Sequence, residues 1–170
     1  MVDLSNKSDK EIDSWISNHE THKGGQATQT ELYRALLIER ARRSQAKQKL
    51  NFETSLAYLQ RAAIDQRCVS YGDLAKASGV DWSQARHQMN GAHGHLDRLL
   101  EICHAKGLPL LTAICVNQQN LASGELGEEA LKGFVFGAQR IGRRVVDPLA
   151  FHHECREECW AWGRAQSTQP

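Results

Sequence analysis

No stretch of this sequence approaches the roughly 20 consecutive apolar residues that a membrane-spanning helix requires. The first residues, Met1 to Lys7, also lack the apolar region of a secretory signal peptide. Disulfide bonding is not indicated, because five cysteines are an odd number in a 170-residue chain that is apolar enough to build a core without disulfides. These absences lead us to expect a cytoplasmic protein with reduced thiols and no membrane partner.

The chain carries little net charge, +1 at pH 7, which excludes a protein that coats DNA through a globally basic surface. Its charge is unevenly distributed, because residues 1–20 contain five acids and two lysines whereas residues 34–49 contain six cations and the single acid Glu39. This positive stripe predicts contacts with DNA phosphates, although a solvated helical face explains it equally well. The side chains expected at phosphates are Arg40, Arg42, Arg43 and Lys47.

The spacing of apolar residues predicts a mostly helical protein. Near the N-terminus, Ile12, Trp15 and Ile16 have the spacing of a short amphipathic helix that could dock on the rest of the chain. Asn51 can cap a helix that begins at Phe52 and turns one apolar side toward the core. The expected segments are a polar tail (residues 1–27), a basic helical arm (28–50), a central domain (51–135) and a C-terminal helical extension (136–170), whose helix opens with Asp147-Pro148 as cap and first-turn proline.

The centre of the chain has the signals of two short successive helices. Ser70 and Asp73 form a capping box, in which the two side chains satisfy backbone amides at a helix start. Gly79 can end that helix in the left-handed conformation, and Asp81 can cap a second helix from Trp82 to about Asn90. This order is typical of a helix-turn-helix.

The expected elements after this helix pair complete a winged helix. A third helix closes at Gly107, and the apolar run from residue 108 to 116 suits a buried strand. Residues 117–127 contain turn formers and predict a hairpin wing, and a helix follows from Glu128 to about Arg140.

Residues 52–135 resemble the DNA-binding domain of the alkylguanine-DNA alkyltransferases and of the alkyltransferase-like proteins. Val69-Ser70-Tyr71-Gly72-Asp73-Leu74-Ala75 is similar to the family's Val-Ser-Tyr-Gly-Glu-Leu-Ala, and Ala85-Arg86-His87-Gln88-Met89-Asn90-Gly91-Ala92 resembles its recognition helix. Leu108 to Ile114 falls where the family carries Ile-Pro-Cys-His-Arg-Val-Val. Alkyl transfer requires a thiolate activated by a neighbouring histidine, and Leu110 and Leu111 stand at those two positions. We therefore expect no catalytic residues and no enzyme activity.

The resemblance implies roles for side chains around the helix pair. In the family, the residue matching Arg86 enters the duplex in place of an extruded nucleotide, and the residue matching Tyr71 contacts the target phosphate. A surface arginine and a half-buried ring are the alternative interpretations of these two residues. Polar groups that could contact a groove without strong base readout are Ser83, Gln84, His87, Gln88 and Asn90, which a plain solvated helix face also explains.

The only cluster of metal-ligand types lies in the C-terminal segment. His152, Cys155 and Cys159 would share a helix face next to His153, but the spacing fits no common zinc module and inward packing of the thiols is the favoured interpretation. We predict no cofactor and no metal.

The sequence thus favours a non-enzymatic protein that binds double-stranded DNA, with modified or distorted duplex as the target. An interaction module or inhibitor that binds a partner protein is the alternative, and a metal- or thiol-dependent enzyme has the least support.

Overall fold

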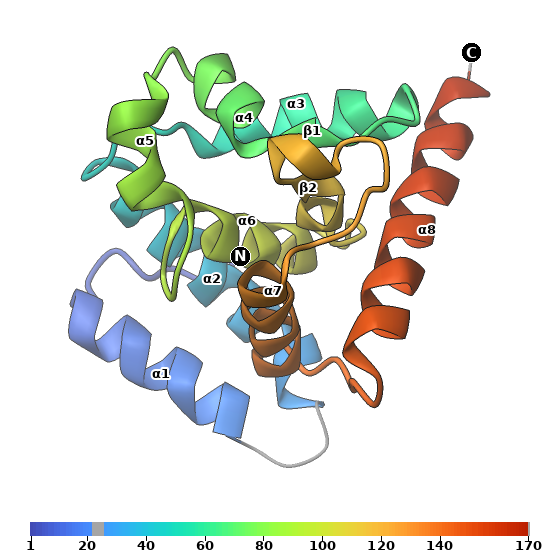
Figure 1. The fold of residues 1–170 in the computed structure, drawn as a ribbon. Helices are drawn as coiled ribbons and strands as arrows, with labels where there is room; N and C mark the ends of the chain where they lie inside the picture. The colour runs from blue at the N-terminus through green and yellow to red at the C-terminus, as the bar shows by residue number, and fades with distance from the viewer. Residues whose placement is uncertain (22–25, 170) are drawn as a thin grey trace.

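The computed structural model describes residues 1–21 and 26–169, and these residues are mostly helical, as the sequence predicts (Figure 1). Eight α-helices account for most of this described part, with one pair of very short strands. None of these helices combines the length and apolar character that crossing a membrane would require.

The N-terminal segment docks on the rest of the chain. Helix α1 (Asp9–Thr21) packs against α2 (Glu31–Gln45), and Ile12 and Ile16 are buried between them. A short 3₁₀ turn, η1 (Ala27–Gln29), precedes α2, whose start is capped by the Thr30 hydroxyl accepting from the Tyr33 amide. The amphipathic spacing in residues 12–16 therefore predicted a helix that belongs to the core.

Helix α8 (Pro148–Ser167) packs against α3 (Phe52–Ile64), with a close contact at the C-terminal end of α3. Asn51 caps α3 and Asp147 caps α8, each through a side-chain oxygen that accepts a backbone amide, as predicted. Gly163 allows the closest approach, because a Cβ atom at this position would overlap the carbonyl group of Ala63 on α3. The C-terminal helix is thus fixed against the centre of the molecule.

The predicted helix pair is present. Helix α4 (Tyr71–Ala77) begins with the complete Ser70–Asp73 capping box, and α5 (Trp82–Met89) follows after a turn at Gly79, whose φ is +71°. Helix α6 (His95–Ala105) comes next, and α7 (Glu128–Arg140) packs beside both α6 and α8.

The segment between α6 and α7 differs from the predicted buried strand and hairpin wing. It forms two 3₁₀ turns, η2 (Leu111–Ile114) and η3 (Gln118–Asn120), around a two-residue strand β2 (Cys115–Val116). Strand β2 pairs in parallel with β1 (Val69–Ser70), through Val69 opposite Cys115 and Ser70 opposite Val116. A continuous apolar run is buried equally well as a strand or as a 3₁₀ turn, and residues 117–127 lack the alternating apolar pattern that a hairpin needs. Both expectations were therefore wrong in their detail.

Candidate functional site

Helix α5 presents a polar face to solvent. Only Ala85 and Met89 of this helix are buried, and these two side chains anchor it to the neighbouring helices. All the predicted groove-facing residues are exposed: Ser83, Gln84, Arg86, His87, Gln88 and Asn90. Ala85 and Met89 are four positions apart and therefore lie on one face of the helix, so its other faces remain exposed to solvent.

Arg86 is the cation that stands out on this face. No hydrogen bond or ion pair to another described residue holds its guanidinium, whereas Lys49 reaches α5 from the end of the arm and donates from Nζ to Gln84 Oε1 at 3.2 Å. The polar face of α5 therefore has Arg86 on the helix and Lys49 beside it.

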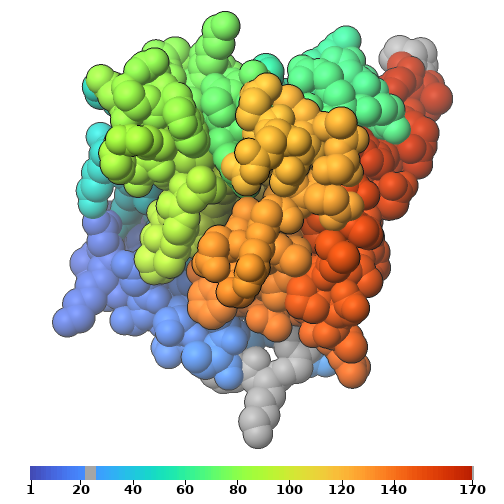
Figure 2. All heavy atoms as spheres, viewed as in Figure 1, coloured from blue at the N-terminus to red at the C-terminus, as the bar shows by residue number. Residues whose placement is uncertain are grey.

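A mainly apolar cavity of about 700 Å³ opens beside the C-terminal end of α5. The segment that follows α5, Asn90 to Ala92, forms one wall, and α7 forms the facing wall, as Figure 2 shows for the lime-green and orange segments. Further lining residues come from α4, α6 and the β2 region: Tyr71, Leu96, Asp97, Leu100, Thr112, Cys115 and Asn117. The cavity is thus built from parts of the chain up to about 65 residues apart, which explains why no local sequence pattern revealed it.

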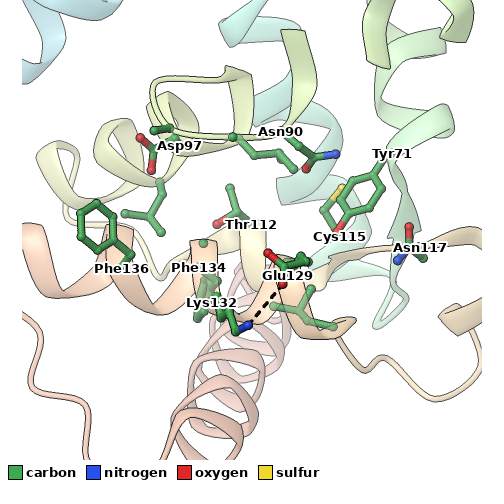
Figure 3. Close-up of a pocket in the computed structure, with 17 residues that line it drawn as sticks. Tyr71, Asn90, Asp97, Thr112, Cys115, Asn117, Glu129, Lys132, Phe134 and Phe136 are labelled. Carbon is green, nitrogen blue, oxygen red and sulfur yellow. Dashed lines mark hydrogen bonds and ion pairs between the residues drawn. The ribbon is translucent and has the colours of Figure 1, made fainter. Parts of the chain in front are cut away.

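Apolar groups make up most of the cavity surface, and the lining also includes polar residues, of which Tyr71 and Thr112 are buried (Figure 3). Burial raises the pKa of Tyr71 to about 12, so its hydroxyl stays protonated and able to donate a hydrogen bond. The Thr112 Oγ1 atom is buried without a hydrogen-bond partner. A ligand group that bonded Thr112 would relieve the unfavourable burial of a lone hydroxyl.

The positions of the family's reactive pair lie outside this cavity. Leu110 and Leu111, at the positions of the reactive cysteine and histidine, are buried in the core and do not line the cavity. The next residue, Thr112, falls at the family's arginine position and does line the cavity. Cys115 also lines it, but burial raises the pKa of this thiol well above its usual range, so the thiol stays protonated. These residues offer shape and hydrogen bonding, without an activated nucleophile.

Several cations of the basic arm form ion pairs with acids, and phosphate contacts of this arm stay a prediction. Arg43 Nη1 lies 2.8 Å from Asp9 Oδ1 and donates to the carbonyl oxygen of Lys7, and Arg43 Nη2 donates to the carbonyl oxygen of Leu4. Arg42 and Arg43 both donate hydrogen bonds to Glu39. These bonds lower the pKa of Glu39 to about 2, and the bond from Arg42 has the larger effect. Lys47 lies 3.4 Å from Asp9. Asp9 of α1 and Glu39 of α2 therefore offset three cations of the stripe that residues 34–49 form in sequence.

Arg40 is held even more firmly, because its partner is buried. Its Nη2 atom lies 2.8 Å from Oε1 of Glu101, a carboxylate that is only 1% exposed, and its Nη1 atom lies 3.3 Å from Asp13. Glu101 also accepts from Arg98 and Arg140, so three guanidinium groups converge on one buried acid. Such a network holds α2, α6 and α7 together, and it leaves Arg40 unsuited to phosphate contacts.

The C-terminal cluster of potential metal ligands separates into two groups. Cys155 and Cys159 pack inward, where burial raises the pKa of Cys155 to about 12 and the Cys159 thiol faces the Leu110 carbonyl. His152 instead lies near His153 and Glu125. Among the described residues, these three side chains form a group that could hold a metal ion, and neither cysteine belongs to it. Glu125 was not predicted, because it is 27 residues away in sequence and lies in a loop.

Ser55 and His95 form a buried hydrogen-bonded pair of the residue types that serve as nucleophile and base, but the histidine donates to the serine and cannot accept its proton. His95 Nδ1 accepts from the Gln48 amide at 3.2 Å, so Nε2 carries the proton and donates to Ser55 Oγ at 2.8 Å. Burial also lowers the pKa of His95 to about 4. This pair is a satisfied core contact, outside the cavity.

Comparisons with protein-family models, with curated proteins and with solved structures found no match to this chain.

Proposed function

We propose that this protein binds double-stranded DNA without catalysis, and that it recognises modified or distorted duplex by taking an extrahelical base into the cavity beside α5. The observation that carries the proposal is the position of the cavity, which opens where the exposed helix ends. The alkyltransferase-like resemblance of residues 52–135 supports the same order of a recognition helix followed by a base pocket, on a helix pair that lacks the hairpin wing.

The relation between Arg86 and the cavity suits base extrusion. Residues four positions apart lie on one helix face, so Arg86 stands one turn before Asn90, which lines the cavity. A guanidinium can fill the gap that a base leaves in the stack, because it is planar, always charged and able to stack. The cavity volume of about 700 Å³ lies within the range of small-ligand sites.

The electrostatics predict weak binding to intact duplex. Arg86 and Lys49 lie at the polar face of α5, whereas Arg40, Arg42, Arg43 and Lys47 form ion pairs with acids. Each phosphate contact contributes about −0.9 to the slope of log affinity against log salt, so two contacts give a slope of about −2. Strong binding would then depend on the base that enters the cavity.

The test is a cavity-filling variant. We expect Ala130→Trp, which adds a large side chain to the cavity wall, to abolish the preference for a duplex with an unpaired base over a fully paired duplex. Binding of the paired duplex should persist. Ala161→Trp, at an exposed position of α8 outside the cavity, is the matched control and should behave as wild type. Fluorescence anisotropy with the two labelled duplexes measures both affinities.

Two results would refute the proposal. One is the absence of binding to either duplex at low salt, and the other is an unpaired-base preference that Ala130→Trp leaves unchanged. The first would favour the second candidate function, binding of a partner protein.

That second candidate rests on Phe136, a large apolar side chain at the cavity rim that is 59% exposed. The Arg140 guanidinium lies over its ring, 5.5 Å from the centroid. Exposed aromatic side chains beside an apolar pocket are typical anchors of protein interfaces. If a partner protein docks here, Phe136→Ala should abolish its binding while the Ser83→Ala control on α5 leaves it intact.

A further inference from the structure

The side chains of Glu125, His152 and His153 meet where the loop before α7 touches the first turns of α8. One potential ligand atom of each residue lies within 4.8 Å of those of the other two. His153 Nε2 lies 2.8 and 2.9 Å from the two carboxylate oxygens of Glu125. The trio lies apart from the cavity lining, although Leu126, the neighbour of Glu125, belongs to that lining.

His152 is prepared as a ligand by its own hydrogen bond. Its Nε2 atom lies 2.9 Å from the carbonyl oxygen of Ala113, and a carbonyl can only accept, so Nε2 carries the ring proton. The other nitrogen, Nδ1, therefore keeps a free lone pair, and it is buried without any hydrogen-bond partner in a residue that is 0% exposed. Metal-binding histidines characteristically donate their second ring nitrogen to a backbone carbonyl, which fixes the tautomer and the ring orientation.

We propose that Glu125, His152 and His153 bind a divalent transition-metal ion of the zinc class. Two imidazole nitrogens and one carboxylate form a ligand set that suits zinc with one position left open. Glu125 and His153 are each about two-fifths exposed, at 36% and 41%, so the open position faces solvent and takes water. This inference is independent of DNA binding.

Metal binding requires only small movements of the three side chains. Ligand atoms around tetrahedral zinc lie roughly 3.3 Å apart, given metal–ligand distances of about 2.0–2.1 Å. His153 and Glu125 are now slightly closer than that, and the widest separation in the trio, at most 4.8 Å, must shorten. The hydrogen bond between His153 and Glu125 would be exchanged for bonds to the metal, and the Nε2 proton of His153 would move to Nδ1 or be released to solvent.

Arg156 opposes the ion and sets an upper limit on affinity. Its Nη1 atom lies 3.6 Å from Glu125 Oε1 and donates to the Gly124 carbonyl at 2.7 Å. This positive charge remains next to the metal, because the carbonyl bonds hold it in place. We therefore expect weaker binding than at a structural zinc site closed by four protein ligands.

The experiment titrates ZnCl₂ into the chelator-treated full-length protein by isothermal calorimetry. We expect one zinc ion per chain, and we expect Glu125→Gln and His153→Ala each to weaken binding by more than about tenfold, the smallest loss usual even for indirect partners of a metal site. Both residues are partly exposed, so their variants should fold, which circular dichroism checks. The matched controls Glu129→Gln and His87→Ala change exposed residues outside the trio and should bind as wild type.

Cobalt distinguishes this site from the thiols of the chain. CoCl₂ bound by nitrogen and oxygen ligands gives visible absorption without the thiolate-to-cobalt charge-transfer band in the near ultraviolet. That band, the absence of saturable zinc binding, or zinc binding that both trio variants leave unchanged would each overturn the proposal.

Discussion

The contact between α8 and α3 at Gly163 predicts a large effect of a single methyl group. A Cβ atom at Gly163 would overlap the carbonyl group of Ala63 and lie 2.8 Å from the Ile64 nitrogen, and these atoms are backbone that cannot turn aside. Gly163→Ala must therefore separate the two helices, and overpacking of this kind costs about 3 kcal/mol at the upper end of its usual range. The higher helix propensity of alanine offsets about 1 kcal/mol. The net loss is about 2 kcal/mol, or about 4–8 °C in Tm for a chain of this size.

Gly133→Ala is the matched control for this prediction. It lies in the interior of α7, where an added Cβ atom meets nothing within 4 Å, so only the helix propensity changes. We expect it to stabilise the protein by about 0.5–1 kcal/mol. Thermal and urea unfolding followed by circular dichroism measure both variants. If Gly163→Ala were as stable as wild type, the close packing of α8 on α3 would be refuted.

Three further predictions concern buried polar groups. Burial lowers the pKa of His95 from 6.5 to about 4, so between these pH values the folded state binds fewer protons than the unfolded state. The free energy of unfolding should therefore fall by about 3 kcal/mol as the pH drops from about 6.5 to 4. Urea unfolding should show a smaller dependence of this free energy on pH for His95→Gln than for wild type. Glu101→Gln removes the negative charge that Arg40, Arg98 and Arg140 share, and it should destabilise the protein by about 3 kcal/mol in urea unfolding. The control Asp13→Asn, at the exposed partner of Arg40, should change stability by less than about 1 kcal/mol in the same assay. Thr112→Val replaces a buried hydroxyl that has no partner, so thermal unfolding should show a gain of about 1 kcal/mol, and a loss of stability would mean that the hydroxyl is satisfied in solution.

The elements that sequence predicted well are those defined by neighbouring residues. The Ser70–Asp73 capping box and the Asn51 and Asp147 caps act over three residues, so their side chains and the amides they satisfy can be recognised together in the sequence. The polar side chains of residues 83–90 likewise indicated a solvated face on α5, and these side chains are exposed. Whether that face binds DNA stays a prediction.

The features that sequence missed depend on contacts between distant segments. Arg40 pairs with Asp13 and Glu101, which are 27 and 61 residues away, and only the docking of α1 and α6 shows that the arm is neutralised. One signal was present: the five acids in residues 1–20 complement the cations in residues 34–49. The cavity had no comparable signal, and of the trio only His152 and His153 could be singled out, because Glu125 lies in a loop that no spacing rule connects to α8.

Arg86→Lys provides the most direct test of the proposed function, because it keeps the charge and removes the planar group. We predict that this variant binds a duplex with an unpaired base more weakly by about 1–3 kcal/mol, the value of one lost stacking contact, while its affinity for the fully paired duplex is nearly unchanged. Arg164→Lys, at an exposed position of α8, should alter neither affinity. Equal effects of Arg86→Lys on both duplexes, or no effect on either, would contradict insertion of Arg86 into DNA.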